Sequence, residues 1–139
     1  MKKTNNKGFS LVELIVVIAI MAVLTVVVAP QFLGYVEDAR RAKDIQMAAS
    51  LHTAYLTDIA DQTITTSVTT ATNVSSQLPS TLSTAPAVEG RLAAVTDFYF
   101  TCDVATGTCV IYGGTSGAET TYNLLDETDA TAYKNATNP

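Results

Sequence analysis

A single carboxylate, Glu13, stands inside the most apolar segment of the chain, Phe9–Ala29. A carboxylate inside a membrane helix costs roughly 2.5 to 3.5 kcal/mol, so an acid at such a position calls for a cationic partner. Cleavage between Gly8 and Phe9 would create an α-amino group four residues from Glu13. In a helical stack of copies of the chain, that amine could pair with a neighbour's Glu13 at low dielectric. We therefore predict electrostatic pairing for these two groups.

Two cysteines, Cys102 and Cys109, lie beyond the apolar segment. Their spacing suits one disulfide formed in an oxidising compartment, and two free thiols are the alternative. A disulfide across two adjacent strands would stiffen the hairpin and stabilise it by roughly 2 to 3 kcal/mol.

The remaining residues offer little for catalysis. The chain has one histidine, His52, and it contains no HExxH or CxxC motif, no phosphate-binding loop with its lysine, and no G-x-S-x-G spacing. We expect no enzyme activity, no cofactor and no metal site. Asp126, Glu127 and Asp129 could supply oxygen ligands to Ca²⁺, but their spacing matches no dedicated loop, so a solvated acidic tail is favoured. The ending KNATNP is expected to be frayed.

The apolar segment is long enough to cross a membrane. Leu14–Ala29 holds sixteen residues without a charge, and the whole of Phe9–Ala29 is twenty-one residues long with Glu13 as its single charge. Lys2, Lys3 and Lys7 precede it, so the positive-inside bias predicts a cytoplasmic N-terminus and an exported remainder.

An ordinary secretory signal is the alternative, with small residues at Val27 and Ala29 before the cut. Pro30 would directly follow that cut, and Glu13 would be unexplained. Both details favour a retained helix.

The segment KGFSLVELIVVIAIMAVLTVVVAP resembles the N-terminal signature of type IV prepilins and type II secretion pseudopilins. The matching features are a basic leader ending in Gly8, Phe9 as the mature N-terminus, Glu13 at the fifth mature position, a long apolar helix and Pro30. The resemblance implies that a membrane prepilin peptidase cuts after Gly8 and N-methylates Phe9. Many relatives carry glycine where this chain has Ala22, so the resemblance leaves open how far the helix unwinds near Pro30.

The resemblance implies a structural subunit of a type IV pilus that supports adhesion, motility or DNA uptake. Its partners would be further copies of the chain in a helical filament, the peptidase, and an inner-membrane assembly platform with its ATPase. The subunit would be a single-pass membrane protein before assembly and extracellular afterwards. The alternative is a pseudopilin of a type II secretion or competence machine, and an uncleaved, membrane-anchored binding domain is a third class.

Composition and the resemblance together predict five consecutive regions, and it is the resemblance that implies the cleavage of the leader and the filament-core role of the helix. The regions are a cleaved leader at 1–8, a transmembrane or filament-core helix at 9–30, its amphipathic continuation at 31–61, a Ser/Thr-rich connecting loop at 62–91, and a sheet with a C-terminal tail at 92–139. After removal of the leader, five basic and thirteen acidic side chains remain. Such an acidic balance argues against nucleic-acid binding through the bulk of the surface.

The amphipathic region has apolar residues at helical spacing, which predicts one face packed on a sheet. That face comprises Ile45, Ala48, His52, Tyr55 and Ile59, flanked by Leu51 and Leu56. The pairs Glu37–Arg41 and Arg40–Asp44 are interpreted as ordinary solvated pairs, with contacts between subunits as the alternative.

Aromatic and β-branched residues dominate 97–104 and 108–112, which predicts a hairpin joined at 105–107 and closed by the cysteines. Gly113, Gly114 and Gly117 predict the next turn, and 121–125 predicts a third strand. The expected fold class is therefore α+β, a long N-terminal helix packed on a small antiparallel sheet of three or more strands.

Overall fold

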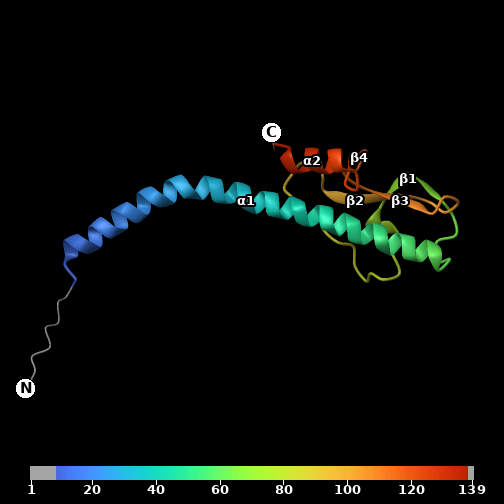
Figure 1. Ribbon diagram of the computed structural model, residues 1–139, viewed down its shortest axis with the longest axis horizontal. Coiled ribbons are helices and arrows are strands. Elements are labelled where there is room, and N and C mark those ends of the chain that lie inside the picture. The colour runs from blue at the N-terminus through green and yellow to red at the C-terminus, as the bar shows by residue number, and fades with distance from the viewer. Residues whose placement is uncertain (1–8, 138–139) are drawn as a thin grey trace, which may run out of the picture. The chain divides into compact units, whose positions relative to one another are not determined.

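The computed structural model describes residues 9–137 (Figure 1). The predicted leader, with Gly8, lies outside the described residues. The chain divides into an N-terminal unit that ends at Val36 and a C-terminal unit that begins at Glu37. The elements are α1 (Leu11–Ala60), β1 (Val68–Asn73), the short 3₁₀ helix η1 (Val74–Ser76), β2 (Asp97–Asp103), β3 (Thr108–Thr115), β4 (Ala118–Asn123) and α2 (Glu127–Asn135).

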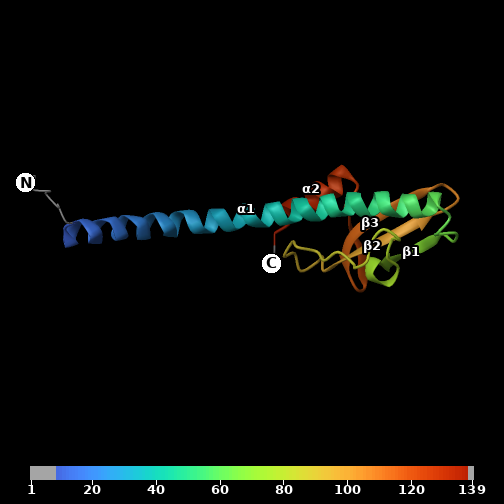
Figure 2. The same cartoon turned by 90° about the horizontal axis from the view of Figure 1, so that it is seen from below.

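The C-terminal unit confirms the α+β prediction. Its four strands pair in the order β1-β2-β3-β4, all antiparallel. The second half of α1 runs along this sheet (Figure 2). The predicted hairpin is the β2–β3 pair, in which Cys102 lies opposite Cys109 and Gly107 turns with φ of 64°. A positive φ favours glycine, so the turn residue suits its place.

The prediction of a loop over 62–91 is wrong for 68–76. Within that range β1 pairs with β2, Val68 lying opposite Cys102 and Asn73 opposite Tyr99, and η1 buries Val74. Threonine and valine favour strands once a partner strand is present. A Ser/Thr-rich composition is typical of loops, so it does not reveal this strand preference. The segment becomes a strand because it pairs with β2.

The third predicted strand is displaced toward the N-terminus. The structure places β4 at Ala118–Asn123, and Leu124 beyond it is buried in the core. Gly113 and Gly114 were predicted in the turn but lie inside β3, and Gly117, with φ of 90°, is in the turn. A Cβ at Gly114 would overlap the carbonyl oxygen of Ala118, so the strands approach too closely there for a side chain.

The core lies between the second half of α1 and the sheet. Tyr55 stacks on Phe100 with ring centroids 4.2 Å apart. Other buried members include Ala48, Leu51, Phe98 and Ile111. His52, predicted on the packed face, is only half-buried and lies outside the core cluster, because the most buried stripe of α1 runs through Leu51 instead.

The prediction that Glu37–Arg41 and Arg40–Asp44 are solvated pairs is wrong, because each pair has one buried member. Arg41 Nε does bond Glu37 Oε1 at 3.0 Å, but Arg41 is buried. Asp44 is also buried and accepts three hydrogen bonds, from Tyr133 Oη at 2.6 Å and from the backbone N–H groups of Glu89 and Gly90 at 2.8 Å each. Both residues therefore belong to the interior of the C-terminal unit.

The C-terminal region forms a helix over Glu127–Asn135, where a solvated acidic tail with a frayed ending was predicted. Asp126 caps α2 by accepting hydrogen bonds from the N–H groups of Thr128 and Asp129. Tyr133 on α2 is fully buried. Arg41 Nη1 donates to the carbonyls of Tyr133 and Lys134 at 3.2 Å each, and to that of Ala136. A buried cation thus satisfies the carbonyl end of α2, which composition alone does not reveal.

Candidate functional site: the exposed apolar helix

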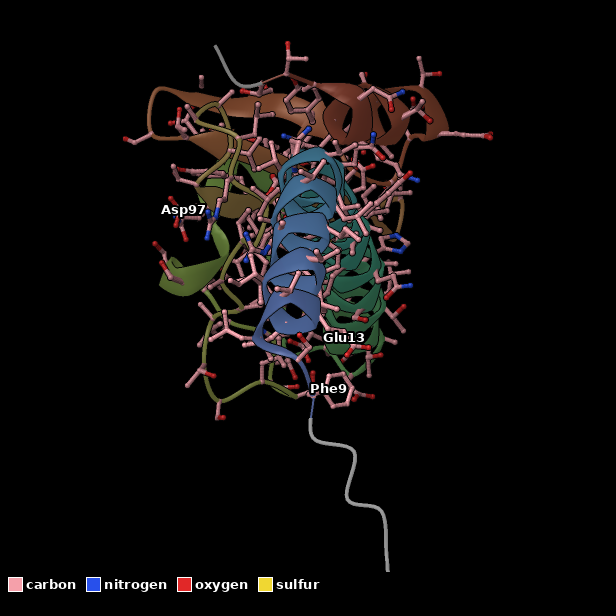
Figure 3. The ribbon with its side chains drawn as sticks, turned by 90° about the vertical axis from the view of Figure 1, so that its left-hand side faces the viewer. Phe9, Glu13 and Asp97 are labelled. Carbon is pink, nitrogen blue, oxygen red and sulfur yellow. A yellow bond between two sulfur atoms is a disulfide. The ribbon has the colours of Figure 1, made fainter. Side chains whose placement is uncertain are left out.

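The N-terminal unit is built from the first part of α1, which begins at Leu11. The first helical hydrogen bond runs from Leu14 N to Ser10 O at 3.2 Å. Glu13 lies in the first turn, and Phe9 precedes the helix. Figure 3 shows the Phe9 and Glu13 side chains near the same end of α1. The carboxylate and the predicted new N-terminus therefore lie four residues apart at the same end of α1.

Almost every large apolar side chain of this unit is exposed. An 18-residue window of α1 reaches a mean hydropathy of 3.1, and none of it is buried. By length and composition this helix can cross a membrane. An apolar surface of that extent is unfavourable in water, so it requires lipid or protein around it.

Pro30 lies within α1, and the helix continues through it. Proline has no N–H to donate to the carbonyl of Val26, so the helix lacks one hydrogen bond at this turn. Five residues earlier, the hydroxyl of Thr25 donates to the carbonyl of Met21 at 2.8 Å. Thr25 carries the one hydroxyl between Leu11 and Pro30, and its hydrogen bond is made within the helix, which suits an apolar environment.

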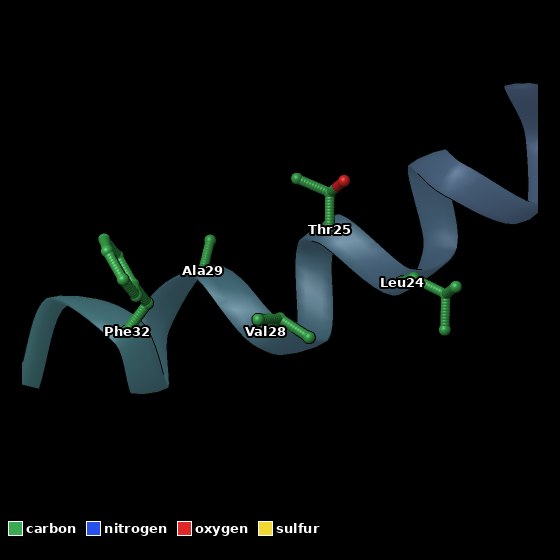
Figure 4. Close-up of a pocket in the computed structure, with 5 residues that line it drawn as sticks. All are labelled: Leu24, Thr25, Val28, Ala29 and Phe32. Carbon is green, nitrogen blue, oxygen red and sulfur yellow. The ribbon is translucent and has the colours of Figure 1, made fainter. Parts of the chain in front are cut away.

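A shallow hollow lies on the surface of α1, and Figure 4 draws the side chains that line it. It has a volume of about 380 Å³ and is lined by Leu24, Thr25, Val28, Ala29 and Phe32. The small side chains at Thr25 and Ala29 lie one turn apart, with larger apolar groups beside them. Small residues let two helices approach closely in an apolar environment. The hollow can therefore receive side chains of another apolar helix.

The predicted disulfide is present in the C-terminal unit, where Cys102 and Cys109 are bonded across β2 and β3. The predicted site residues thus fall into two groups. Phe9, Glu13 and Pro30 belong to the N-terminal unit, and the cysteines stabilise the sheet.

Sequence reasoning missed one group on α1. Phe32, Leu33 and Tyr35 lie beyond Pro30 and are 62%, 68% and 70% exposed. The signal that could have found them is the absence of charge between Pro30 and Glu37.

The charged residues that follow begin with Glu37. Burial acts to raise the pKa of Glu37, but the backbone N–H of Arg91 and the side chain of Arg41 outweigh it and lower that pKa. The Arg91 N–H lies 2.6 Å from Glu37 Oε1. Glu37 therefore stays ionised and marks the end of the uncharged part of α1.

Comparison with known proteins agrees with this geometry. Residues 3–29 match the model of the prokaryotic N-terminal methylation motif. The chain is also similar to prepilin peptidase-dependent protein A of Clostridium perfringens, with 42% identity over 69 residues, which is 49% of each chain. The chain thus spans about half the length of this curated relative. No solved structure matches it significantly.

The protein carries the N-terminal signature shared by type IV prepilins and pseudopilins. Its long apolar helix and four-stranded antiparallel sheet form a pilin-like α+β arrangement. The signature and the exposed helix are consistent with membrane anchoring before assembly.

Proposed function

We propose that the protein is the precursor of a structural subunit of a type IV pilus, a helical filament of many copies held together by their apolar helices. The observation that carries this proposal is the wholly exposed apolar stretch of α1 headed by Glu13. Such a surface suits the membrane before assembly and the filament core afterwards, and it needs no catalytic group.

Processing is the first step of the proposal. The peptidase cuts between Gly8 and Phe9 and methylates the new amine, which keeps a positive charge near Glu13. In the filament, the amine of one subunit lies beside Glu13 of its neighbour. Low dielectric makes that pairing strong, and an unpaired Glu13 there would be costly.

The remaining parts of the proposal follow from this assembly. The N-terminus faces the cytoplasm before assembly, because Lys2, Lys3 and Lys7 precede the span. An assembly platform with its ATPase extracts the subunit into the filament, and the C-terminal unit then faces the exterior. Adhesion, motility or DNA uptake would be properties of the filament as a whole.

The first experiment is mass spectrometry of the mature N-terminus, on filaments sheared from cells and separately on membranes. Methylated Phe9 in the sheared fraction supports a surface pilus. Methylated Phe9 confined to membranes would replace the proposal with the pseudopilin alternative. A terminus at Met1 or Pro30 would contradict assembly by this route.

The pairing has its own test in the variant Glu13→Ala. We expect normal membrane insertion and a loss of filament yield of at least about tenfold, because breaking a desolvated charge pair costs roughly 3 to 5 kcal/mol. Asp38→Ala is the matched control, since it removes an exposed carboxylate further along α1. Normal filament yield from Glu13→Ala would contradict the pairing of Glu13 with a neighbour's N-terminal amine.

A further inference from the structure

The uncharged part of α1 extends well past Pro30. From Leu14 to Val36 there are twenty-three residues without a charge, bounded by Glu13 on one side and Glu37 on the other. As a helix this segment is about 34 Å long, against a bilayer hydrocarbon core of about 30 Å. A slight tilt makes the two lengths match.

The outer boundary of the segment is sharply defined. Glu37, Asp38, Arg40 and Arg41 follow Val36 almost without interruption. Glu37 is held by hydrogen bonds from Arg41 Nε and from the Arg91 N–H, so it is committed to the C-terminal unit. This group of charges cannot enter the hydrocarbon at an acceptable cost.

A span over 9–30 would create two difficulties. It would draw the Glu13 carboxylate into the hydrocarbon before any partner subunit is present. It would also leave Phe32, Leu33 and Tyr35 in water. The protein itself does not cover these side chains, which are 62%, 68% and 70% exposed. A span over 14–36 removes both difficulties, because Glu13 then lies at the inner boundary and these side chains lie in the outer leaflet.

Tyr35 occupies the position that an interfacial aromatic residue requires. It lies two residues before Glu37, and Phe32 is three residues earlier on the same face of α1. Tyrosine rings gather where acyl chains meet headgroups, because the ring is apolar and the hydroxyl is polar. Pro30 then lies within the outer leaflet, where proline is tolerated in membrane helices.

We propose that before assembly the bilayer is spanned by residues 14–36, with Phe32 and Tyr35 anchoring α1 at the outer lipid headgroup boundary and Glu13 at the inner one. This inference rests on the proposed function, since it specifies how the unassembled subunit sits in its membrane. It assigns the lipid interface as the partner of the exposed aromatic side chains that follow Pro30.

The chain contains no tryptophan, so single tryptophans can report depth in the full-length protein. The variants are Ile20→Trp, Leu24→Trp and Tyr35→Trp, each reconstituted in phosphatidylcholine/phosphatidylglycerol vesicles with lipids brominated at different depths. In a 14–36 span, position 24 lies about 1.5 Å and position 20 about 7.5 Å from the bilayer centre. In a 9–30 span the order is reversed, and position 20 is the deeper of the two.

We expect Leu24→Trp to be quenched most by lipids brominated near the chain ends, and Tyr35→Trp by lipids brominated near the carbonyls. Deeper quenching of Ile20→Trp than of Leu24→Trp, with Tyr35→Trp open to aqueous quenchers, would overturn the proposal while leaving membrane anchoring intact. Aqueous quenching of all three would instead refute the membrane anchor of the proposed function.

A second set of variants tests the aromatic side chains themselves. In the Leu24→Trp background, replacing Phe32 and Tyr35 together by alanine should move the reporter off the bilayer centre. Leu33→Ala in the same background is the matched control, because it removes an equally exposed apolar group without removing a ring. An unchanged reporter depth in the double variant would remove the anchoring role from the rings.

Discussion

The two units of the chain treat similar side chains in opposite ways. Leu24 in the N-terminal unit is 58% exposed, whereas Leu51 in the C-terminal unit is 1% exposed. Both are leucines on α1, so helix propensity does not separate them. The difference teaches that the C-terminal unit completes its own core, while the N-terminal unit depends on lipid or on other subunits for burial.

The charged residues of the two units differ in the same way. Asp44 and Asp58 in the C-terminal unit are buried, and each accepts hydrogen bonds from the chain that follows η1. Glu13 in the N-terminal unit is exposed, and its proposed partner is the amine of another subunit. The first kind of acid stabilises a fold, and the second is suited to assembly.

The largest effect should come from matched leucine truncations. Leu51→Ala should lower the free energy of unfolding of the C-terminal unit by about 3 to 4 kcal/mol, through lost burial and the cavity left behind. Leu24→Ala should leave it unchanged within about 0.5 kcal/mol. Denaturant unfolding in detergent, followed by near-ultraviolet circular dichroism, measures both, and equal destabilisation would contradict the division into two units.

A smaller effect should follow from removing a buried acid. Asp44→Ala should lower the free energy of unfolding by about 3 kcal/mol, because Tyr133 Oη and two backbone N–H groups lose their acceptor. The exposed Asp38→Ala is the control and should change the free energy by less than about 0.5 kcal/mol. Similar values for both variants in the same unfolding experiment would show that the Asp44 hydrogen bonds contribute little.

The smallest predicted effect is a loss of stability at alkaline pH, and it comes from the buried tyrosines. Burial, with the nearby charge of Asp58, raises the pKa of Tyr55, and burial together with the Asp44 hydrogen bond raises that of Tyr133. Because both pKa values are raised on folding, their contribution to stability is fully present below the ordinary tyrosine pKa of about 10 and is lost as pH rises above it. Melting temperature should therefore fall above about pH 10, and Tyr55→Phe should weaken that fall.

If the melting temperature is the same at pH 8 and pH 11, neither hydroxyl is held neutral by the fold. Tyr112, which is half-buried on β3, provides the comparison. Its replacement by phenylalanine should leave the alkaline fall unchanged, because its side chain is only half-buried and is not part of the core cluster.

Local patterns in the sequence predicted much of this protein. The uncharged run of α1 marks a membrane-length helix, the basic residues and Glu13 around it carry the prepilin signature, and aromatic and β-branched residues mark the β2–β3 hairpin with its disulfide. These features depend on neighbours a few residues apart, so spacing alone reveals them.

Tertiary contacts decided the rest. β1 exists because β2 pairs with a Thr-rich segment that composition marks as loop. Arg41 and Asp44 look like surface charges until α2, about ninety residues later, supplies carbonyls and a tyrosine hydroxyl to satisfy them. The sequence by itself determined the apolar helix and its processing signature, because these need only local hydropathy and charge. Only the folded chain decided which polar groups are buried, because burial is tolerated where distant partners complete the hydrogen bonds.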